Sequence, residues 1–251
     1  MDSRIIAAGA SCTGQAHLKT KTPNQDSYLI REYESGLVLA AADGLGSRKY
    51  SHLGSRAICK AVCNAFERWD RLESSDVEKL VELVNKYWFA DPSLAGDKSE
   101  YATTCLFAIY LKTGELLIAQ LGDGIILYKI DEESNVLQEK EDDFSNFTKS
   151  IHNCSYAGEW KYKSIDMGNR DLTLMLATDG VSEDLIVEKR GEFLDYLKKR
   201  VSQGANLEER NNIISGILEG WITKYHNDDK TLLLLYKEDE NGNISGENCE
   251  R

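Results

Sequence analysis

Short apolar runs separated by polar turns alternate along this chain with stretches of helical periodicity. Several of the runs end at a carboxylate, and runs of this length bounded by Gly, Asn and Asp are typical of buried strands. The sequence predicts strands at residues 5–10, 26–31, 37–42, 103–111, 116–121, 125–130, 172–178 and 231–236.

Four further segments have the periodicity of helices. The first is predicted from apolar residues that repeat at helical spacing, namely Leu53, Ala57, Ala61, Ala65 and Trp69. The second begins at a capping box, with Ser75 as the N-cap and Glu78 at the third position. Two more helices are predicted at 187–201 and 207–224, the latter with Asn206 as its N-cap.

The order of these elements predicts the fold class. Short turns at 112–115 and 122–124 make the strands that they join antiparallel. Strands followed by blocks of helices indicate an α+β fold in which helices cover sheets that pack on each other. We expect one domain at 1–236, with a polar insertion at 131–164 that holds a short strand. The polar segment 237–251 is predicted to be a disordered tail.

Composition narrows the class of protein. The chain has 251 residues, a formal charge of −12 and a pI near 4.9. This acidity argues against binding to nucleic acid or to a membrane surface, because both favour clustered Lys and Arg. The beginning of the sequence shows no signal-peptide pattern, and no apolar run approaches membrane-spanning length.

The cysteines point to a reducing compartment. The six cysteines show no C-x-x-C spacing, and in a chain of this length they do not form a disulfide scaffold. The expected location is therefore the cytoplasm.

Aspartates recur at the ends of the apolar runs, usually beside a glycine. Asp43, Asp123 and Asp179 each precede a glycine, and Asp26 and Asp228 flank two further strands. A single Asp-Gly pair is more often a turn than a ligand. Five charges at the edge of a core nevertheless require compensation, and hard oxygen ligands favour Mg²⁺ or Mn²⁺. The pattern predicts a metal centre lined by carboxylates.

These residues also carry a family resemblance. The chain resembles the type 2C metal-dependent serine/threonine phosphatases from about residue 9 to residue 236, and the stretch 13–26 resembles their divergent, mostly bacterial branch. The motifs occur in the family's order: Asn24-Gln25-Asp26, Ala41-Ala42-Asp43-Gly44-Leu45-Gly46, Thr103-Thr104, Leu121-Gly122-Asp123-Gly124, Ala177-Thr178-Asp179-Gly180 and Asp228-Asp229-Lys230-Thr231.

The resemblance implies a sandwich of two antiparallel sheets flanked by helices (α-β-β-α), with two Mn²⁺ or Mg²⁺ ions at one end. By motif position, Asp43 would bridge both ions and the Gly44 carbonyl would bind one. Asp179 and Asp228 would complete the other site, and Asp26 would act through waters. Asp123 with Asp179 matches the pair that holds a third, weaker ion in several members.

The resemblance also implies the reaction. A water between the two ions, its pKa lowered by their charge, would attack the phosphorus of a phosphoserine or phosphothreonine in line. Asp43 and Asp179 are thus the expected catalytic residues, acting through that water. The expected partner is a phosphoprotein substrate, and we take the protein to be a monomer.

Two positions depart from the family pattern. Where many members have an arginine that grips phosphate, this chain has Lys21, with Lys19 nearby, and lysine lacks the bidentate fork of arginine. We assign phosphate binding to these two lysines. Leu45 occupies the place of a histidine proposed as a general acid in eukaryotic members. His17 could contact phosphate, although a structural role is the more common one. The insertion 131–164 falls where the family carries a variable flap.

Two other functions stay open at this stage. The chain could be a catalytically weak relative that binds phosphoproteins as an adaptor, because the arginine and histidine positions are lost. It could also be a two-metal hydrolase of small phosphoesters. Retention of all five acidic positions favours the protein phosphatase.

Overall fold

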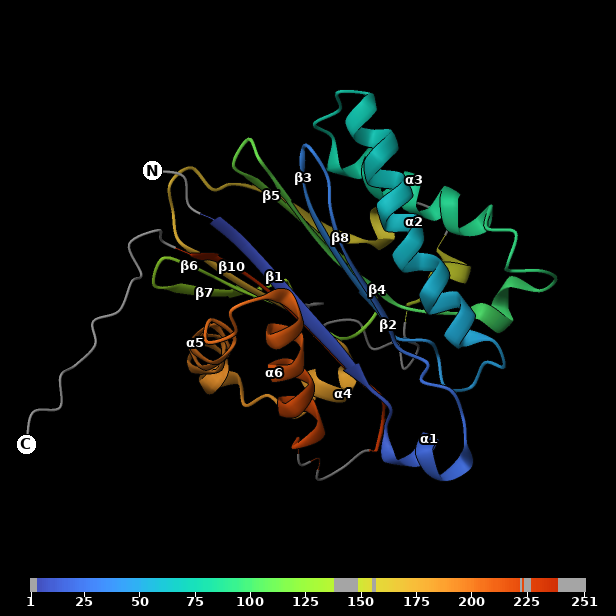
Figure 1. Ribbon diagram of the computed structural model, residues 1–251. Coiled ribbons are helices and arrows are strands. Elements are labelled where there is room, and N and C mark those ends of the chain that lie inside the picture. Colours follow the sequence, from blue (N-terminus) through green and yellow to red (C-terminus); the bar gives the residue numbers. More distant parts are fainter. Residues whose placement is uncertain (1–3, 138–148, 155–156, 222, 224–226, 239–251) are drawn as a thin grey trace, which may run out of the picture.

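In the computed structural model, two antiparallel sheets of five strands pack face to face (Figure 1). The structure describes residues 4–137, 149–154, 157–221, 223 and 227–238. The first sheet has the order β1 (Arg4–Cys12), β10 (Lys230–Glu238), β9 (Leu172–Ala177), β6 (Ile125–Ile130) and β7 (Glu133–Val136). The second has the order β2 (Ser27–Glu32), β3 (Gly36–Ala42), β4 (Cys105–Leu111), β5 (Glu115–Leu121) and β8 (Lys161–Asp166).

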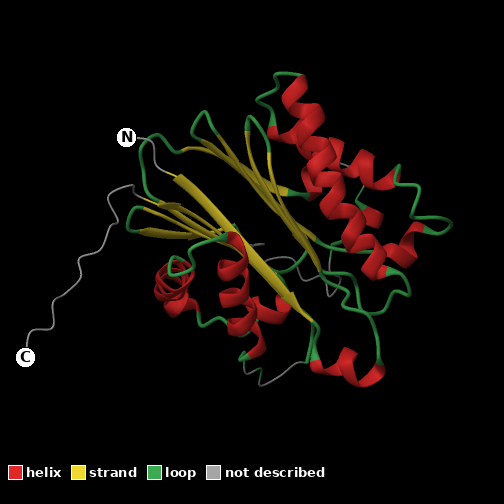
Figure 2. Cartoon of the chain, in the orientation of Figure 1, coloured by secondary structure: helices red, strands yellow, loops and turns green. Residues whose placement is uncertain are grey.

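Helices cover both outer faces of the sandwich (Figure 2). Helices α2 (Ser51–Arg71) and α3 (Val77–Phe89) cover the second sheet, and α5 (Arg190–Val201) and α6 (Leu207–Glu219) cover the first. The short helices α1 (Gln15–Thr20) and α4 (Asp179–Ser182) lie toward one end of the sandwich. The predicted α-β-β-α fold is confirmed.

The strands β3, β4, β5, β9 and β10 are largely apolar because they are buried on both faces of their sheets, whereas the edge strands β7 and β8 are more polar and exposed. In β3, Leu39 and Ala41 point into the core between the sheets, whereas Val38 and Ala40 point toward α2. The side chains of a strand alternate between its faces, so one strand serves two cores. The sequence therefore shows continuous apolar runs where a solvent-facing sheet would show alternation.

The register of the strands brings the acidic strand ends together. Ser27 pairs with Ala42, so the start of β2 lies beside the end of β3. Ile125 and Leu232 both pair with Ala177, so β6 and β10 begin where β9 ends. At the sheet's edge, β1 pairs with β10 along its whole length, from Arg4 opposite Glu238 to Cys12 opposite Lys230.

Several boundaries differ from those predicted. The segment before Gln25, expected as a loop, contains α1. The N-cap of α3 is Asp76 rather than Ser75, because the Asp76 carboxylate accepts a hydrogen bond from the Glu78 amide at 2.9 Å. Gly220 caps α6, which ends well before 224. Strand β10 continues past 236 to Glu238, and 239–251 lie outside the described residues.

The polar stretch 131–164 contributes more structure than the single short strand expected. It supplies β7 and the start of β8, and the side chains of Ile151 and Trp160 are buried in the core beneath α2 and α3. These apolar residues are spaced too widely for a periodic pattern to reveal them. Residues 138–148 and 155–156 lie outside the described part of the chain.

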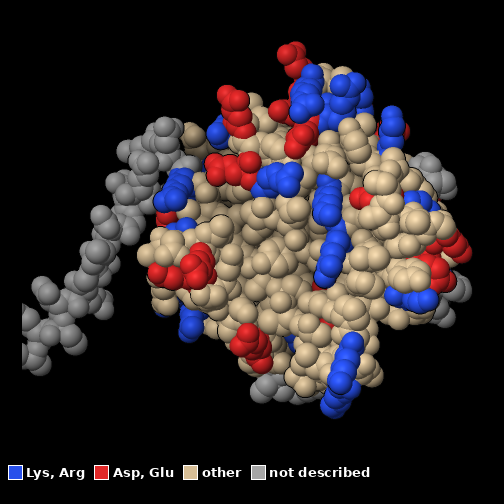
Figure 3. All heavy atoms as spheres, turned by 45° about the vertical axis from the view of Figure 1, so that its right-hand side comes forward, with Lys and Arg blue, Asp and Glu red and all other residues tan. Residues whose placement is uncertain are grey.

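The surface charge is uneven. Despite the net charge of −12, Lys and Arg side chains gather along a line on the face that includes α2 (Figure 3). Exposed basic residues on α2 include Arg56, Lys60 and Arg68. Within the described residues, no helix combines the length and apolar character needed to cross a bilayer.

The assigned N-cap can be tested by mutation. We expect Asp76→Ala to lower the free energy of unfolding by about 1 kcal/mol, because the first turn of α3 loses its side-chain acceptor. Ser75→Ala, one residue earlier and also exposed, serves as the matched control and should be nearly neutral. Urea unfolding measures both variants, and a larger loss for Ser75→Ala would contradict the assignment.

Candidate metal centre

Three aspartate carboxylates meet at one end of the sandwich. Asp43 follows β3, Asp123 lies in the turn between β5 and β6, and Asp179 follows β9. Each of the three offers a carboxylate oxygen, and these oxygens all lie within 4.8 Å of one another. The three come from both sheets, so the packing of the sandwich creates the cluster.

The local backbone explains how these side chains are presented. The Asp43 carbonyl accepts hydrogen bonds from the Thr103 hydroxyl at 2.7 Å and the Thr104 amide at 2.8 Å. The Thr104 hydroxyl accepts from the Asp43 amide at 3.0 Å. The Thr103-Thr104 pair therefore fixes the backbone of Asp43 from the neighbouring strand.

Glycine is required beside two of the acids. A Cβ on Gly44 would lie 2.7 Å from the Ser51 carbonyl and 2.8 Å from the Gln25 carbonyl, so no side chain fits where α2 begins. Gly122 and Gly124 flank Asp123 with φ of 86° and 92°, in the left-handed region that favours glycine. The Asp-Gly pattern of the sequence thus has a steric cause at both places.

Asp26 lies beneath this cluster and is almost fully buried, with 6% of its surface exposed. Its Oδ2 accepts hydrogen bonds from the hydroxyls of Thr231 at 2.7 Å and Thr178 at 2.8 Å. Its Oδ1 has no donor among the described residues, and its carboxyl lies at hydrogen-bonding distance from that of Asp43. A buried acceptor oxygen without a donor can accept a hydrogen bond from a water or can bind a cation.

The pKa values of these acids are raised, which shows that their ionised forms are unfavourable when no positive charge is nearby. Burial raises the pKa of Asp26 to about 7, and the charge of Asp229 adds to this against the threonine hydrogen bonds. Burial and then the charges of Asp123 and Asp228 raise the pKa of Asp179 to about 8. Burial and then Asp26, Asp179 and Asp123 raise the pKa of Asp43 well above its usual range.

The donor set fits a hard divalent cation. All the groups are oxygens, they come from several strand ends, and each carboxylate raises the proton affinity of the next. A divalent ion would replace these protons and remove the repulsion. We therefore consider Asp43, Gly44, Asp123, Asp179, Asp228 and Asp26 as the residues that could hold Mg²⁺ or Mn²⁺.

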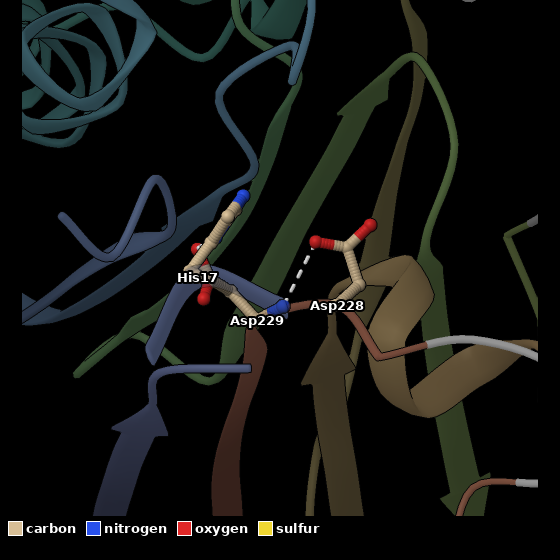
Figure 4. Close-up of side chains that lie close together, drawn as sticks. All are labelled: His17, Asp228 and Asp229. Atoms are coloured by element: carbon tan, nitrogen blue, oxygen red, sulfur yellow. Dashed lines mark hydrogen bonds and ion pairs between the residues drawn. The ribbon is translucent and has the colours of Figure 1, made fainter. Parts of the chain in front are cut away.

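Asp228 and Asp229 have different environments although they are adjacent. Asp228 is exposed, and its carboxylate accepts a hydrogen bond from the Asp229 amide at 2.8 Å (Figure 4). Asp229 has 1% of its surface exposed and is engaged by donors from the segment before β2. A carboxylate oxygen of Asp228 lies within 4.8 Å of ligand atoms of His17 and Asp229, and its charge also raises the pKa of Asp179.

The two lysines predicted to bind phosphate are exposed, unlike the buried Asp26 and Asp229. Lys19 is on α1, Lys21 follows it with φ of 57°, and both side chains are exposed. His17, on the same helix, places Nδ1 2.9 Å from Asp229 Oδ2. Phosphate binding by Lys19 and Lys21 stays a prediction.

Residues that the sequence did not single out complete the site. Thr178 and Thr231 hold Asp26, and the buried carboxylate of Asp229 contacts the loop before it. All three lie within the motifs of the family pattern, but only Asp229, which shares an acidic pair with Asp228, has a charge that suggests a role. The two threonines resemble ordinary strand residues until the sheets are packed.

Comparisons with known proteins agree with this geometry. The sequence profile of the family described as Protein phosphatase 2C matches residues 13–219. A search of curated protein sequences finds no match.

Solved structures with the same fold include several bacterial phosphatases. RsbX in complex with magnesium has a TM-score of 0.59 and 18% identity, covering 94% of this chain and 99% of that chain. A bacterial serine phosphatase has a TM-score of 0.68 and 16% identity, covering 94% and 98%. The serine/threonine phosphatase Stp1 from Staphylococcus aureus has a TM-score of 0.64 and 16% identity, covering 95% and 97%. At these identities the likeness is one of fold.

The raised pKa values predict an unusual dependence of stability on pH. In the metal-free protein, Asp26 and Asp179 titrate in the folded state near 7 and 8, above their unfolded value of about 4. The folded state then binds more protons than the unfolded state in this window. Stability is therefore present at low pH and is lost as pH rises from about 4 to about 8. Each acid contributes about 1.4 kcal/mol per pH unit up to its folded-state pKa, so we expect a loss of up to about 5 kcal/mol between pH 5.5 and 8, measured by urea unfolding in chelator.

Asp43→Asn provides the control for this measurement. Removing one charge should make the metal-free variant more stable than the wild type at pH 8 and flatten its pH profile. Saturating Mn²⁺ should stabilise the wild type more at pH 8 than at pH 5.5. A metal-free wild type that gains stability steadily toward pH 8 would contradict the electrostatic account.

Proposed function

This chain belongs to the protein phosphatase 2C family, and we propose that it hydrolyses phosphoserine and phosphothreonine in proteins with the help of divalent metal ions. The observation that carries the proposal is the convergence of Asp43, Asp123 and Asp179 from both sheets, with their oxygens within 4.8 Å. Holding three carboxylates this close together is costly unless cations neutralise them. Retaining the cluster at this cost is most readily explained by catalysis.

The two sheets contribute different halves of the proposed centre. Asp43 and the Gly44 carbonyl would come from the second sheet, and Asp179 and Asp228 from the first. We propose that these groups hold two Mn²⁺ or Mg²⁺ ions, with Asp123 and Asp179 holding a weaker third. Bound divalent ions would lower the pKa of the attacking water and would offer positive charge to the phosphate oxygens.

Asp26 has a separate role in this proposal. The threonine hydroxyls occupy its Oδ2, Oδ1 has no donor among the described residues, and the Asp26 carboxyl lies at hydrogen-bonding distance from that of Asp43. Oδ1 can orient a water at the centre and accept its proton. Holding one oxygen and freeing the other fixes the direction in which the proton moves.

An anionic substrate must approach a protein of net charge −12. Local cations would offset this repulsion, and the line of Lys and Arg in Figure 3 runs over α2. Helix α2 begins at Ser51, whose backbone packs on Gly44, and the exposed residues Arg56 and Lys60 follow within its first three turns. Lys19 and Lys21 would add positive charge from α1. We propose that these groups guide a phosphorylated protein segment to the site.

We also place this activity in the cytoplasm. Cys59 and Cys105 are buried as free thiols, and burial raises the pKa of both, so they stay protonated. Thiols of this kind belong to apolar packing and persist in a reducing compartment.

Metal-dependent phosphate release tests the proposal. The Mn²⁺-loaded protein should release phosphate from a phosphoserine or phosphothreonine peptide, and exhaustive chelation should abolish the release. Asp43→Asn and Asp179→Asn should each lower kcat at least ~100-fold, because each removes a group worth several kcal/mol of transition-state stabilisation. Asp195→Asn on the exposed surface of α5 is the matched control and should keep wild-type activity.

Three outcomes would count against the proposal. Activity that survives chelation would remove the metal from the mechanism. Hydrolysis of p-nitrophenyl phosphate without hydrolysis of any phosphopeptide would point to a hydrolase of small phosphoesters. Phosphopeptide binding without turnover at saturating Mn²⁺ would indicate an adaptor protein.

A further inference from the structure

Asp229 is a buried carboxylate whose contacts all lead to one segment of the chain. Its Oδ1 accepts a hydrogen bond from the Gly14 amide at 2.7 Å. Its Oδ2 accepts from the Gln25 amide at 2.6 Å and from His17 Nδ1 at 2.9 Å. Figure 4 shows the ring of His17 beside Asp229 and the Asp228 carboxylate nearby, and ligand atoms of the three residues lie within 4.8 Å of one another. One side chain at the start of β10 thus binds both ends of the segment 14–25.

The backbone of Gln25 links Asp229 to the residues around Gly44, which follows the second sheet's strand β3. Its amide donates to Asp229, and its carbonyl accepts from the Gly44 amide at 3.1 Å and the Ser55 hydroxyl at 2.6 Å. A continuous chain of hydrogen bonds therefore runs from Asp229 through Gln25 to Gly44. Its two ends are the residues next to Asp228 and Asp43, which belong to opposite halves of the proposed centre.

We propose that Asp229 is a positioning residue that sets the separation between the two halves of the metal centre, and that His17 supports it through Nδ1 alone. The inference rests on the proposed function, because it assumes that the two halves hold metal together. His17, Asp228 and Asp229 have ligand atoms within 4.8 Å of one another, but both oxygens of Asp229 already accept hydrogen bonds from N–H donors, so we assign Asp229 a positioning role rather than that of a ligand. Groups of this kind orient the ligands of metal sites and affect metal affinity as strongly as some of the ligands do.

The chemistry of the contacts requires a carboxylate at this position. Both oxygens of Asp229 accept from N–H donors, and two of the three donors are backbone amides that cannot turn away. An asparagine would direct its NH₂ group at one of these amides in either orientation, leaving two donors facing each other. Asp229→Asn should therefore disturb the chain of hydrogen bonds although the two side chains have nearly the same shape.

His17 provides the third donor to Asp229 and is the more exposed of the two residues. The side chain of His17 is 18% exposed and that of Asp229 is 1% exposed. An asparagine at position 17 can place its amide nitrogen close to the location of Nδ1, whereas a leucine cannot donate. His17→Asn therefore preserves the proposed contact while removing Nε2, and His17→Leu removes both.

Calorimetric titration with Mn²⁺ alone tests this inference without any substrate. Relative to the wild type, Asp229→Asn and His17→Leu should weaken Mn²⁺ binding roughly tenfold or more, the usual loss for groups that orient metal ligands. His17→Asn should keep most of the wild-type affinity. Ser55→Ala, which removes the 2.6 Å contact on the other side of Gln25, should weaken binding in the same direction as Asp229→Asn. Asp195→Asn serves as the control for loss of a charge.

Unfolding of each metal-free variant checks that it is folded, and Ser55→Ala keeps the test decisive if Asp229→Asn does not fold. Wild-type Mn²⁺ affinity in Asp229→Asn, or in Ser55→Ala, would overturn the inference. Equal weakness of His17→Asn and His17→Leu would also overturn it, because Nε2 would then matter. If the wild type binds Mn²⁺ as expected but releases no phosphate, the proposed function fails and the positioning role stands.

Discussion

Repulsion between carboxylates held close together at the edge of an apolar core is the constraint on which this structure depends. Asp26, Asp43 and Asp179 cannot all be ionised in that position without a neighbouring cation, and burial raises the pKa of each. The fold maintains the arrangement because each acid is attached to a strand whose two faces are packed. Stability elsewhere in the sandwich thus compensates for strain at its end.

The sandwich makes the site by joining two incomplete halves. In the proposed centre, one sheet would contribute Asp43 and Gly44 and the other Asp179 and Asp228, so each sheet would supply only part of the ligands. Asp26 belongs to the second sheet by sequence, yet its hydrogen bonds go to threonines of the first. The contacts between the sheets are therefore polar at this end and apolar in the middle, which fixes how far one sheet can slide over the other.

Much of this could be predicted from the sequence because apolar runs and Asp-Gly pairs are local signals. They indicated the strands, the α+β class and the acidic end of each strand. The N-cap of α3 was missed because Ser75 and Asp76 both suit that position, and only the backbone decides between them. The partners of Asp26 were missed for a different reason. Thr231 lies 205 residues away in the sequence, and no local pattern reports a hydrogen bond of that span.

The pairing of β1 with β10 affects how the first sheet can fold during synthesis on the ribosome. Strand β1 is synthesised well before β10, the strand with which it pairs. Until then, the apolar side chains of Ile6 and Ala8 and an open strand edge are available to other nascent chains. The first sheet is therefore complete only when β10 has been added, and β10 is also the strand that Asp228 precedes.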